Sequence, residues 1–485
     1  MWGVRQVAAL AALTLALLAA GCGGEGSAVG GAADVAPADA LAFVALDTDL
    51  DGDQWKQAQD LAARFPSGRD AFQSFIDELA QDDLDFETDV KPALGPDAYL
   101  VVLAAETDAG GPRAAFLTQP EDPAKLDELL ERSGEEFVKA EIDDWTVVAQ
   151  DEATLAALRA RDDSLADESA FEDAMGKLPE EALVRVFVDG GALARQTERS
   201  GGLDEGERAA VDCLGSEGAG GASAFALSAE DGGVRLTGVT KSGETDGPDS
   251  SSSELSSSLP GGAIALVSIN GLGEQARRVL RCLADTDEEV ARQIAAAELG
   301  LGVSIDEDVL PLFDGETAVA VYEGTTPAVV VASEVEDEEK ARATLARIIE
   351  RASAFLDEIE AEGVSVGGLQ ASRLTIRGTQ VFYAVTDGKL VVTSSEELLA
   401  SVAEGGGALT EDDAFRAAAE AAGAPDETAG LLFADLEKIV GRALGLAPAD
   451  VPAEGAANLE PLESLFLWGE RDGDWFTFEG LLGID

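Results

Sequence analysis

Histidine is absent from all 485 residues of the chain. This absence removes the commonest general base, the commonest metal ligand and every histidine-dependent catalytic triad. Cysteine occurs only three times, at Cys22, Cys213 and Cys282. Three thiolates without histidine are too few for a typical zinc site. Because no other motif has the pattern of an active site, we expect a protein that is not an enzyme and has no catalytic residues.

Basic residues are also scarce, with 33 lysines and arginines against 95 aspartates and glutamates. Such a surface repels phosphate backbones and anionic lipid head groups, which excludes nucleic acid as a partner. The acidity has two interpretations, either solubility in salty surroundings or capture of cations and basic partners. The 46% of hydrophobic residues is enough for real cores, so the chain is not an acidic disordered protein.

The N-terminus has the features of an export signal. Arg5 precedes an apolar stretch over residues 7–20, which is too short to span ~30 Å of hydrocarbon comfortably. Small residues then lead to Cys22 in a pattern that resembles a bacterial lipobox. We predict a signal peptide over residues 1–21 and acylation of Cys22, the alternatives being an ordinary signal peptide or a retained membrane anchor. The mature chain would keep 32 bases against 95 acids, a net charge of −63.

Residues 22–35 are rich in glycine and alanine, which predicts a flexible tether between the lipid and a folded body. A lipid followed by a flexible segment lets a domain stand away from a membrane. The lipid at Cys22 is therefore the predicted membrane contact, and the predicted location is extracytoplasmic, on the outer face of the cell membrane.

Cys213 and Cys282 remain as an even pair once Cys22 carries lipid. An oxidising compartment favours a disulfide between them. That bond would close a loop of about 70 residues, worth ~4 kcal/mol in the chain-entropy model. The alternative is a pair of buried, unreactive thiols.

Internal repetition gives the architecture. Residues 89–94 (DVKPAL) recur as residues 308–313 (DVLPLF), and a hairpin pattern around residues 231–233 recurs around residues 472–474. The order of elements predicts two tandem copies, residues 36–241 and residues 259–485, joined by a solvated serine-rich linker over residues 242–258. Short-turn strands with helices between pairs of them predict an α+β fold with largely antiparallel sheets flanked by helices.

A smaller unit occurs four times, over residues 37–47, 179–189, 260–270 and 425–435. In each copy a proline precedes an apolar strand, and the strand closes on Asp47, Asp189, Asn270 or Asp435. A closing Asp or Asn suits the N-cap of a following helix. Residues 341–359 carry an apolar stripe at spacings of three and four, which predicts a helix packed on a sheet, with a partner-binding groove as the alternative.

Asp47, Asp49 and Asp51 have the spacing of the first half of a calcium loop, with Gly52 at the position of its sharp turn. The twelfth position should supply a bidentate glutamate but holds Ala58. The alternative is a capped, solvated turn. We expect no cofactor otherwise. Paired carboxylates for glycoside hydrolysis would always be found among 95 acids, so that pattern indicates little.

The segment from Phe65-Pro66 through residues 89–95 to the apolar strand at residues 99–103 resembles an uncharacterised family of actinobacterial lipoproteins, domain of unknown function 3352. The resemblance implies an envelope lipoprotein and carries no catalytic residues. The leading hypothesis is thus a non-enzymatic binding or structural module whose partner is an envelope protein, a cell-wall polymer or an apolar ligand. The alternative is a calcium-dependent module or a carboxylate-based hydrolase.

Overall fold

The computed structural model describes residues 30–69, 86–105, 111–200, 213, 221–241, 249–355, 359–404, 408–446 and 452–485. Cys22, the predicted signal peptide and most of the predicted tether lie outside these residues. The acylation of Cys22 therefore stays a prediction. Within the described ranges, no helix combines the length and the apolar character that crossing a membrane requires.

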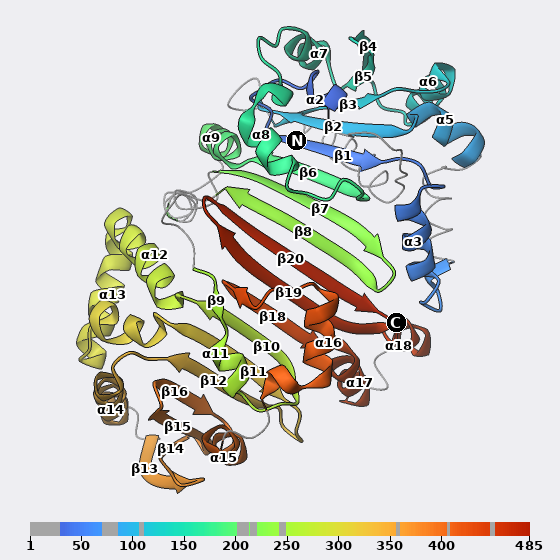
Figure 1. Cartoon of the computed structure of the whole chain (residues 1–485). Coiled ribbons are helices and arrows are strands. Elements are labelled where there is room, and N and C mark those ends of the chain that lie inside the picture. Colours follow the sequence, from blue (N-terminus) through green and yellow to red (C-terminus); the bar gives the residue numbers. More distant parts are fainter. Residues whose placement is uncertain are drawn as a thin grey trace.

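One antiparallel sheet of 18 strands runs through the whole molecule (Figure 1). From edge to edge, its strand order is β4–β5–β3–β2–β1–β6–β7–β8–β20–β19–β18–β10–β11–β12–β16–β15–β14–β13. Helices connect and cover these strands. The predicted α+β class with largely antiparallel sheets is therefore confirmed.

The strands of the first half are β1 (Ala42–Asp47), β2 (Asp97–Leu103), β3 (Arg113–Thr118), β4 (Val138–Ile142), β5 (Trp145–Ala149), β6 (Val184–Asp189), β7 (Ala222–Glu230) and β8 (Gly233–Lys241). The strands of the second half are β10 (Ala263–Asn270), β11 (Glu316–Tyr322), β12 (Ala328–Glu334), β13 (Ile359–Val366), β14 (Leu369–Ile376), β15 (Thr379–Thr386), β16 (Lys389–Thr393), β18 (Gly430–Asp435), β19 (Leu462–Asp472) and β20 (Trp475–Ile484). A separate small ladder pairs β9 (Ser251–Ser252) with β17 (Glu427–Thr428).

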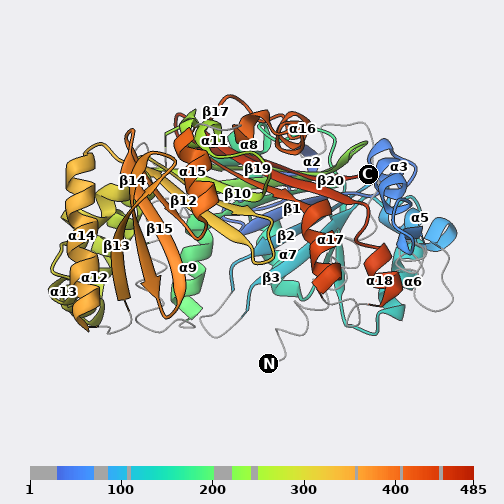
Figure 2. The same cartoon turned by 90° about the horizontal axis from the view of Figure 1, so that it is seen from below.

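The helices are α2 (Gly30–Ala33), α3 (Asp53–Ala62), α5 (Lys91–Leu94), α6 (Pro123–Arg132), α7 (Glu152–Arg159), α8 (Ser169–Met175), α9 (Gly190–Ser200), α11 (Glu254–Ser258), α12 (Leu272–Thr286), α13 (Glu288–Leu301), α14 (Glu338–Phe355), α15 (Glu396–Glu404), α16 (Asp413–Ala421), α17 (Leu436–Leu446) and α18 (Ala453–Ala457). Figure 2 shows α8, α11 and α16 on one face of the sheet, while α9 and α17 lie on the other.

The two halves of the sheet have corresponding strand orders. Strand β1 lies between β2 and β6, and β10 lies between β11 and β18 in the same way. Hairpins β7–β8 and β19–β20 then meet through the β8–β20 pair. The origin of the two halves as tandem copies stays a prediction, which this matching order supports.

Each half has its own hydrophobic core on the face that carries α8, α11 and α16. The first core gathers Phe43, Leu155 and Phe171 with their neighbours, and the second gathers Leu255, Phe415 and Phe433. A further core under α3, α5 and α6 covers the opposite face of the first half. Strand residues alternate between the two faces, so side chains two positions apart on β1 or β10 meet the same core.

The four proline-led units form the central strands β1, β6, β10 and β18, as predicted. The cap prediction is confirmed at two of them, where Asp189 Oδ1 accepts the amide of Ala192 at 2.8 Å and Asp435 Oδ1 accepts that of Lys438 at 2.9 Å. It is wrong at Asp47 and Asn270. Helix α3 begins only at Asp53, and α12 begins after Gly271, so neither side chain reaches a helix amide.

Parts of the predicted tether and linker belong to the folded body. Ala32, Ala33 and Val35 are fully buried in the first core, because Gly30–Ala33 form α2 on the sheet. In the predicted solvated linker, Ser251–Ser252 form β9 and Leu255 of α11 is fully buried. The short apolar side chains within both segments contribute enough buried surface to order them.

The long second-half helix α14 ends at Phe355, and Ile359 begins strand β13. The predicted helix over residues 341–359 is therefore too long at its C-terminal end, although Ala341 and Leu345 do pack against a small core on the sheet. The predicted disulfide is confirmed, since Cys213 and Cys282 are bonded with their Cα atoms 5.6 Å apart. It joins the first half to α12 of the second.

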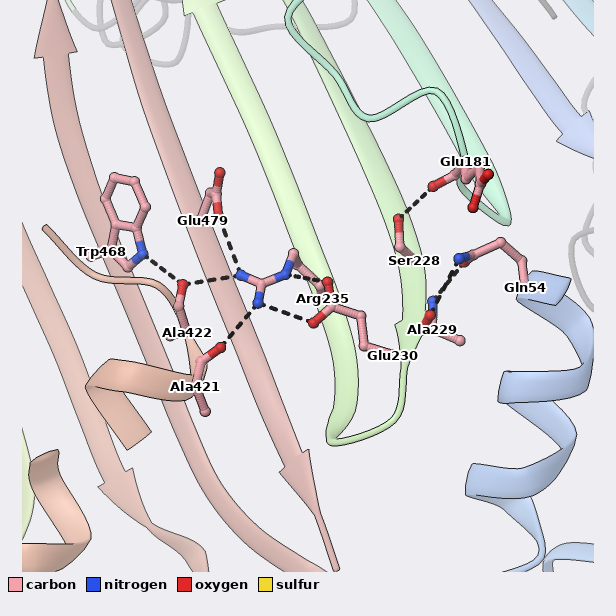
Figure 3. A network of polar contacts seen from close by, with 10 residues as sticks. All are labelled: Gln54, Glu181, Ser228, Ala229, Glu230, Arg235, Ala421, Ala422, Trp468 and Glu479. Carbon is pink, nitrogen blue, oxygen red and sulfur yellow. Dashed lines mark hydrogen bonds and ion pairs between the residues drawn. The ribbon is translucent and has the colours of Figure 1, made fainter. Parts of the chain in front are cut away.

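Arg235 of β8 holds the two halves together at their junction (Figure 3). Its guanidinium forms an ion pair with Glu230 at 2.6 Å and reaches Glu479 of β20 at 3.2 Å. It also donates to the carbonyls of Ala421 and Ala422, each at 3.0 Å, at the end of α16. Hydrogen bonding to Glu230 raises the pKa of Arg235 further, so the cation is fixed at any physiological pH.

Candidate functional site

A cleft of about 410 Å³ opens where β1 ends and where β2 and β6 begin, and we call it the acidic cleft. It is lined by side chains of both signs, with acids in the majority. The lining residues are Ala45, Leu46, Asp47, Asp49, Asp51, Gly52, Asp53, Gln54, Asp97, Tyr99, Glu180, Glu181, Ala182 and Arg185. Its size falls in the range of small-molecule pockets.

Strand register brings the central groups together. Asp47 at the end of β1 lies opposite Asp97 at the start of β2. Two positions earlier, Ala45 lies between Tyr99 on β2 and Arg185 on β6. Because side chains alternate along a strand, these two rows point to the same face of the sheet. A buried guanidinium and two carboxyl groups therefore line one cleft.

Arg185 is the unusual member of this group. Only 7% of the residue is exposed, and no hydrogen bond or ion pair joins its guanidinium to any described residue. Burial lowers the pKa of Arg185, while Tyr99 and Asp97 oppose that shift from a distance. A buried charge is normally paired, because removing it from water costs several kcal/mol (~3–5 kcal/mol when one partner is missing).

The two facing carboxyl groups resist ionisation. Burial, followed by the neighbouring Asp97 and Asp49 carboxylates, raises the pKa of Asp47 to about 8, and the Arg185 charge only partly opposes this. Burial also raises the pKa of Asp97, again against the influence of Arg185. Near neutral pH, Asp47 is therefore largely protonated and can donate a hydrogen bond as well as accept one.

Two acids of the predicted calcium loop lie beside a lysine, and calcium binding stays a prediction. Lys91 of α5 lies 2.6 Å from Asp51 and 3.6 Å from Asp49, so an ammonium group already neutralises these carboxylates. The hydrogen bond from Lys91 lowers the pKa of Asp51. Asp47 instead turns into the cleft, where its Oδ1 accepts the amide of Asp49 at 3.3 Å. Among the described residues, no group of three or more potential ligands could hold a metal ion.

The wall of the cleft is anchored on β7 (Figure 3). Gln54 of α3 exchanges two hydrogen bonds with the backbone of Ala229, at 2.8 and 3.3 Å. The hydroxyl of Ser228 donates to the carbonyl of Glu181 at 3.2 Å. Two lining segments are thus fixed to the central sheet, so the cleft is a preformed feature of the fold.

Sequence reasoning found Asp47, Asp49 and Asp51 and missed Asp97, Tyr99 and Arg185. One local signal did exist for Arg185, a charged residue within the apolar strand pattern VRVFV of residues 184–188. The strand counterpart in the second half is Leu431, which lies opposite Ser268 as Arg185 lies opposite Ala45. Leu431 packs against the second core, so the fold itself does not require a charge there.

No curated protein matches the chain. Among solved structures, the chain is similar to crystal forms IV, III and I of a protein called TP0453. The sequence identities are 11%, 11% and 13%, and the TM-scores are 0.24, 0.25 and 0.24. These matches cover 46%, 47% and 44% of this chain and 76%, 79% and 72% of the other. At such low TM-scores the likeness supports no inference about function.

A protein-family model provides the remaining comparison. The family is described as Protein of unknown function (DUF3352), and its model matches residues 124–467. The matched range runs from the start of α6 to β19, so it includes β6 with Arg185 and most of both halves. The chain belongs to this family of unknown function.

Proposed function

We propose that the protein is an exported, lipid-anchored binding protein without catalytic activity, and that its ligand binds in the acidic cleft. The observation that carries the proposal is Arg185, a buried guanidinium that lines the cleft and has no hydrogen-bonded or ion-paired partner in the described part of the chain. Charged groups with a perturbed pKa in a cleft concentrate at functional sites.

A purely structural role does not explain why a buried arginine stands at position 185. The counterpart position in the second half holds Leu431, which contributes apolar contact to the core. An arginine at the same place costs desolvation and receives no direct contact in return. A ligand with an anionic group would supply the missing partner through a bidentate hydrogen-bonded pair.

Among the ligand classes expected from the sequence, the cleft favours a polar one. Its lining combines Arg185 with the carboxyl groups of Asp47, Asp97 and Glu180, whereas an apolar ligand needs a mainly hydrophobic wall. A purely anionic ligand is also disfavoured, because the whole chain carries a formal net charge of −62. The ligand should therefore carry both signs of charge.

Saturation-transfer NMR on the mature protein tests this function with a mixture of acetate, ethylamine, glycine, glucose and tri-alanine. We expect at least one compound to bind the wild-type protein and to lose its signal in Arg185→Leu. The matched control is Arg292→Leu, because Arg292 is 72% exposed on α13 and far from the cleft lining. Binding that is absent in all three proteins, or equal in all three, would contradict the proposal.

The proposed location rests on the sequence of the first 22 residues. An apolar stretch that ends in small residues before Cys22 supports export and acylation, and the acidic surface leaves the lipid as the membrane contact. Metabolic labelling with a fatty acid should mark the wild-type protein and not Cys22→Ser. A Cys22→Ser form that matures and sediments with membranes as before would exclude the anchor.

A carboxylate-based hydrolase is the second candidate, and the facing pair Asp47 and Asp97 favours it. A carboxyl group with a pKa near 8 has the protonation state of a general acid at neutral pH. Incubation with tri-alanine and with a β-linked disaccharide distinguishes the two candidates. Product that accumulates with wild type and not with Asp47→Asn would favour the hydrolase over the binding protein.

A further inference from the structure

The second half shows what occupies the counterpart of the acidic cleft. There Asn270 lies opposite Glu316, as Asp47 lies opposite Asp97 in the first half. The chain segment that contains β9 and the start of α11 covers this pair, and β9 forms an antiparallel ladder with β17. A segment of the protein's own chain, made of the extended β9 and the first turn of α11, thus covers this pair, whereas the corresponding pair in the first half lines an open cleft.

Backbone groups of that segment bind the two side chains directly. Glu316 accepts the amide of Leu255 at 2.9 Å and is also hydrogen bonded to the hydroxyl of Ser253. The side-chain amide of Asn270 donates to the carbonyl of Asp249 in that segment at 3.2 Å, and also to the carbonyl of Thr428 in β17 at 2.8 Å. The acid thus accepts a peptide N–H in the first turn of α11, and the side-chain amide donates to a carbonyl that precedes the extended β9, so the pair binds backbone groups of both polarities.

The first half offers the same two functions at the corresponding positions. Asp97 replaces Glu316 as the acceptor. Asp47 replaces Asn270, and a protonated carboxyl has one acceptor and one donor oxygen, as the side-chain amide of Asn has an acceptor and a donor. The corresponding pair of side chains thus lines the open cleft.

Arg185 is the group that the first half adds. Its counterpart Leu431 has no polar atom, whereas a guanidinium holds a carboxylate through two parallel hydrogen bonds. The carboxylates of Glu180 and Asp53 also line the cleft and would attract an ammonium group.

We infer that the acidic cleft binds a short extended peptide, with the free C-terminal carboxylate on Arg185 and a backbone N–H on Asp97. This inference rests on the proposed function and specifies its ligand class. The C-terminal carboxylate would pair with Arg185, and the acidic side chains of the lining would attract the N-terminal ammonium group. That attraction would offset the repulsion between the carboxylate and an overall acidic protein.

Isothermal titration calorimetry on the mature protein tests the inference with two probes, tri-alanine and its C-terminal amide. We expect the wild-type protein to bind the acid at least about tenfold more tightly than the amide, because only the acid pairs with Arg185. In Arg185→Leu the acid and the amide should bind equally, because the guanidinium that distinguishes the carboxylate from the amide is no longer present. Asp97→Asn should weaken both probes by a similar factor. Arg185→Lys should keep part of the preference.

Cooperative thermal melting of each variant checks that loss of binding is not loss of the fold. An amide that binds wild type as tightly as the acid would overturn the inference. Acetate that binds as tightly as tri-alanine would also overturn the inference, because the peptide backbone would then contribute nothing. The proposed function would stand in that case, since the cleft would still bind a carboxylate. Binding that requires removal of residues 23–29 would show instead that the chain's own segment is the occupant.

Discussion

Replacing Arg185 by leucine should make the protein more stable while removing its binding activity. The residue is 93% buried without a direct partner, and leucine is the residue that the second half uses at the counterpart position. Substituting a well-packed apolar side chain for a buried charge is typically neutral or stabilising, which gives an expected gain of about 1–3 kcal/mol in the free energy of unfolding.

The gain should depend on pH. Arg185 lowers the pKa of both Asp47 and Asp97, so its removal makes their ionisation more costly. At pH 5 to 6 the carboxyl group of Asp47 is protonated, so no attraction between Asp47 and Arg185 offsets the gain. Above pH 8, where Asp47 ionises, the lost attraction should cancel part of it. The stabilisation is therefore expected to be larger at pH 6 than at pH 8.5.

Urea unfolding followed by tryptophan fluorescence measures this effect at both pH values, with Arg292→Leu as the exposed control. The control should change stability by less than about 0.5 kcal/mol. A loss of more than about 2 kcal/mol in Arg185→Leu at pH 6 would refute the reasoning. That result would mean that Arg185 has a structural partner and stabilises the fold directly.

Three further perturbations test other parts of the structure. Asp47→Asn should leave stability unchanged near pH 4 and raise it by about 1–3 kcal/mol near pH 8. Between the unfolded pKa of 3.8 and the folded pKa of about 8, the unfolded chain releases the Asp47 proton while the folded protein keeps it, so wild-type stability falls as the pH rises. The upper bound of about 6 kcal/mol for this loss is reduced by solvent screening, because the group is only partly buried. Urea titrations across pH 4 to 9 measure the difference, and a variant that is less stable at pH 8 would contradict it. Arg235→Ala should cost about 2–4 kcal/mol in urea unfolding, since it removes ion pairs and carbonyl contacts at the junction of the halves; a loss below about 0.5 kcal/mol would show that the β8–β20 pairing suffices. Replacing Cys213 and Cys282 by serine opens a loop with a sequence separation of 69 and should lower stability by about 4 kcal/mol, as measured by thermal and urea unfolding; an unchanged urea midpoint would mean that the linker region is already constrained.

Local sequence patterns predicted the local structure well. Alternating apolar residues bounded by proline gave the central strands, and the hairpin turns at residues 231–233 and 472–474 lie between β7 and β8 and between β19 and β20. Asp122 also caps α6, where its Oδ1 accepts the amide of Ala124 at 3.0 Å. These features depend on residues within a few positions of one another, so sequence spacing is enough to define them.

The acidic cleft could not be predicted in this way, because strand register rather than spacing creates it. Asp97 and Arg185 meet across β1 only after β2 and β6 have paired with it on either side. The same reason explains why the lysine beside the predicted calcium loop could not be foreseen. The spacing of Asp49 and Asp51 is compatible with a cation loop, but Lys91 comes from a different element and neutralises both acids.

A crystal structure of the mature protein soaked with tri-alanine tests the central claim most directly. The account predicts a peptide in the acidic cleft, with its carboxylate hydrogen bonded to both terminal nitrogens of Arg185 and a backbone amide on Asp97. A cleft without peptide in which Arg185 forms a direct ion pair with Asp97, or a peptide bound elsewhere on the molecule, would contradict it.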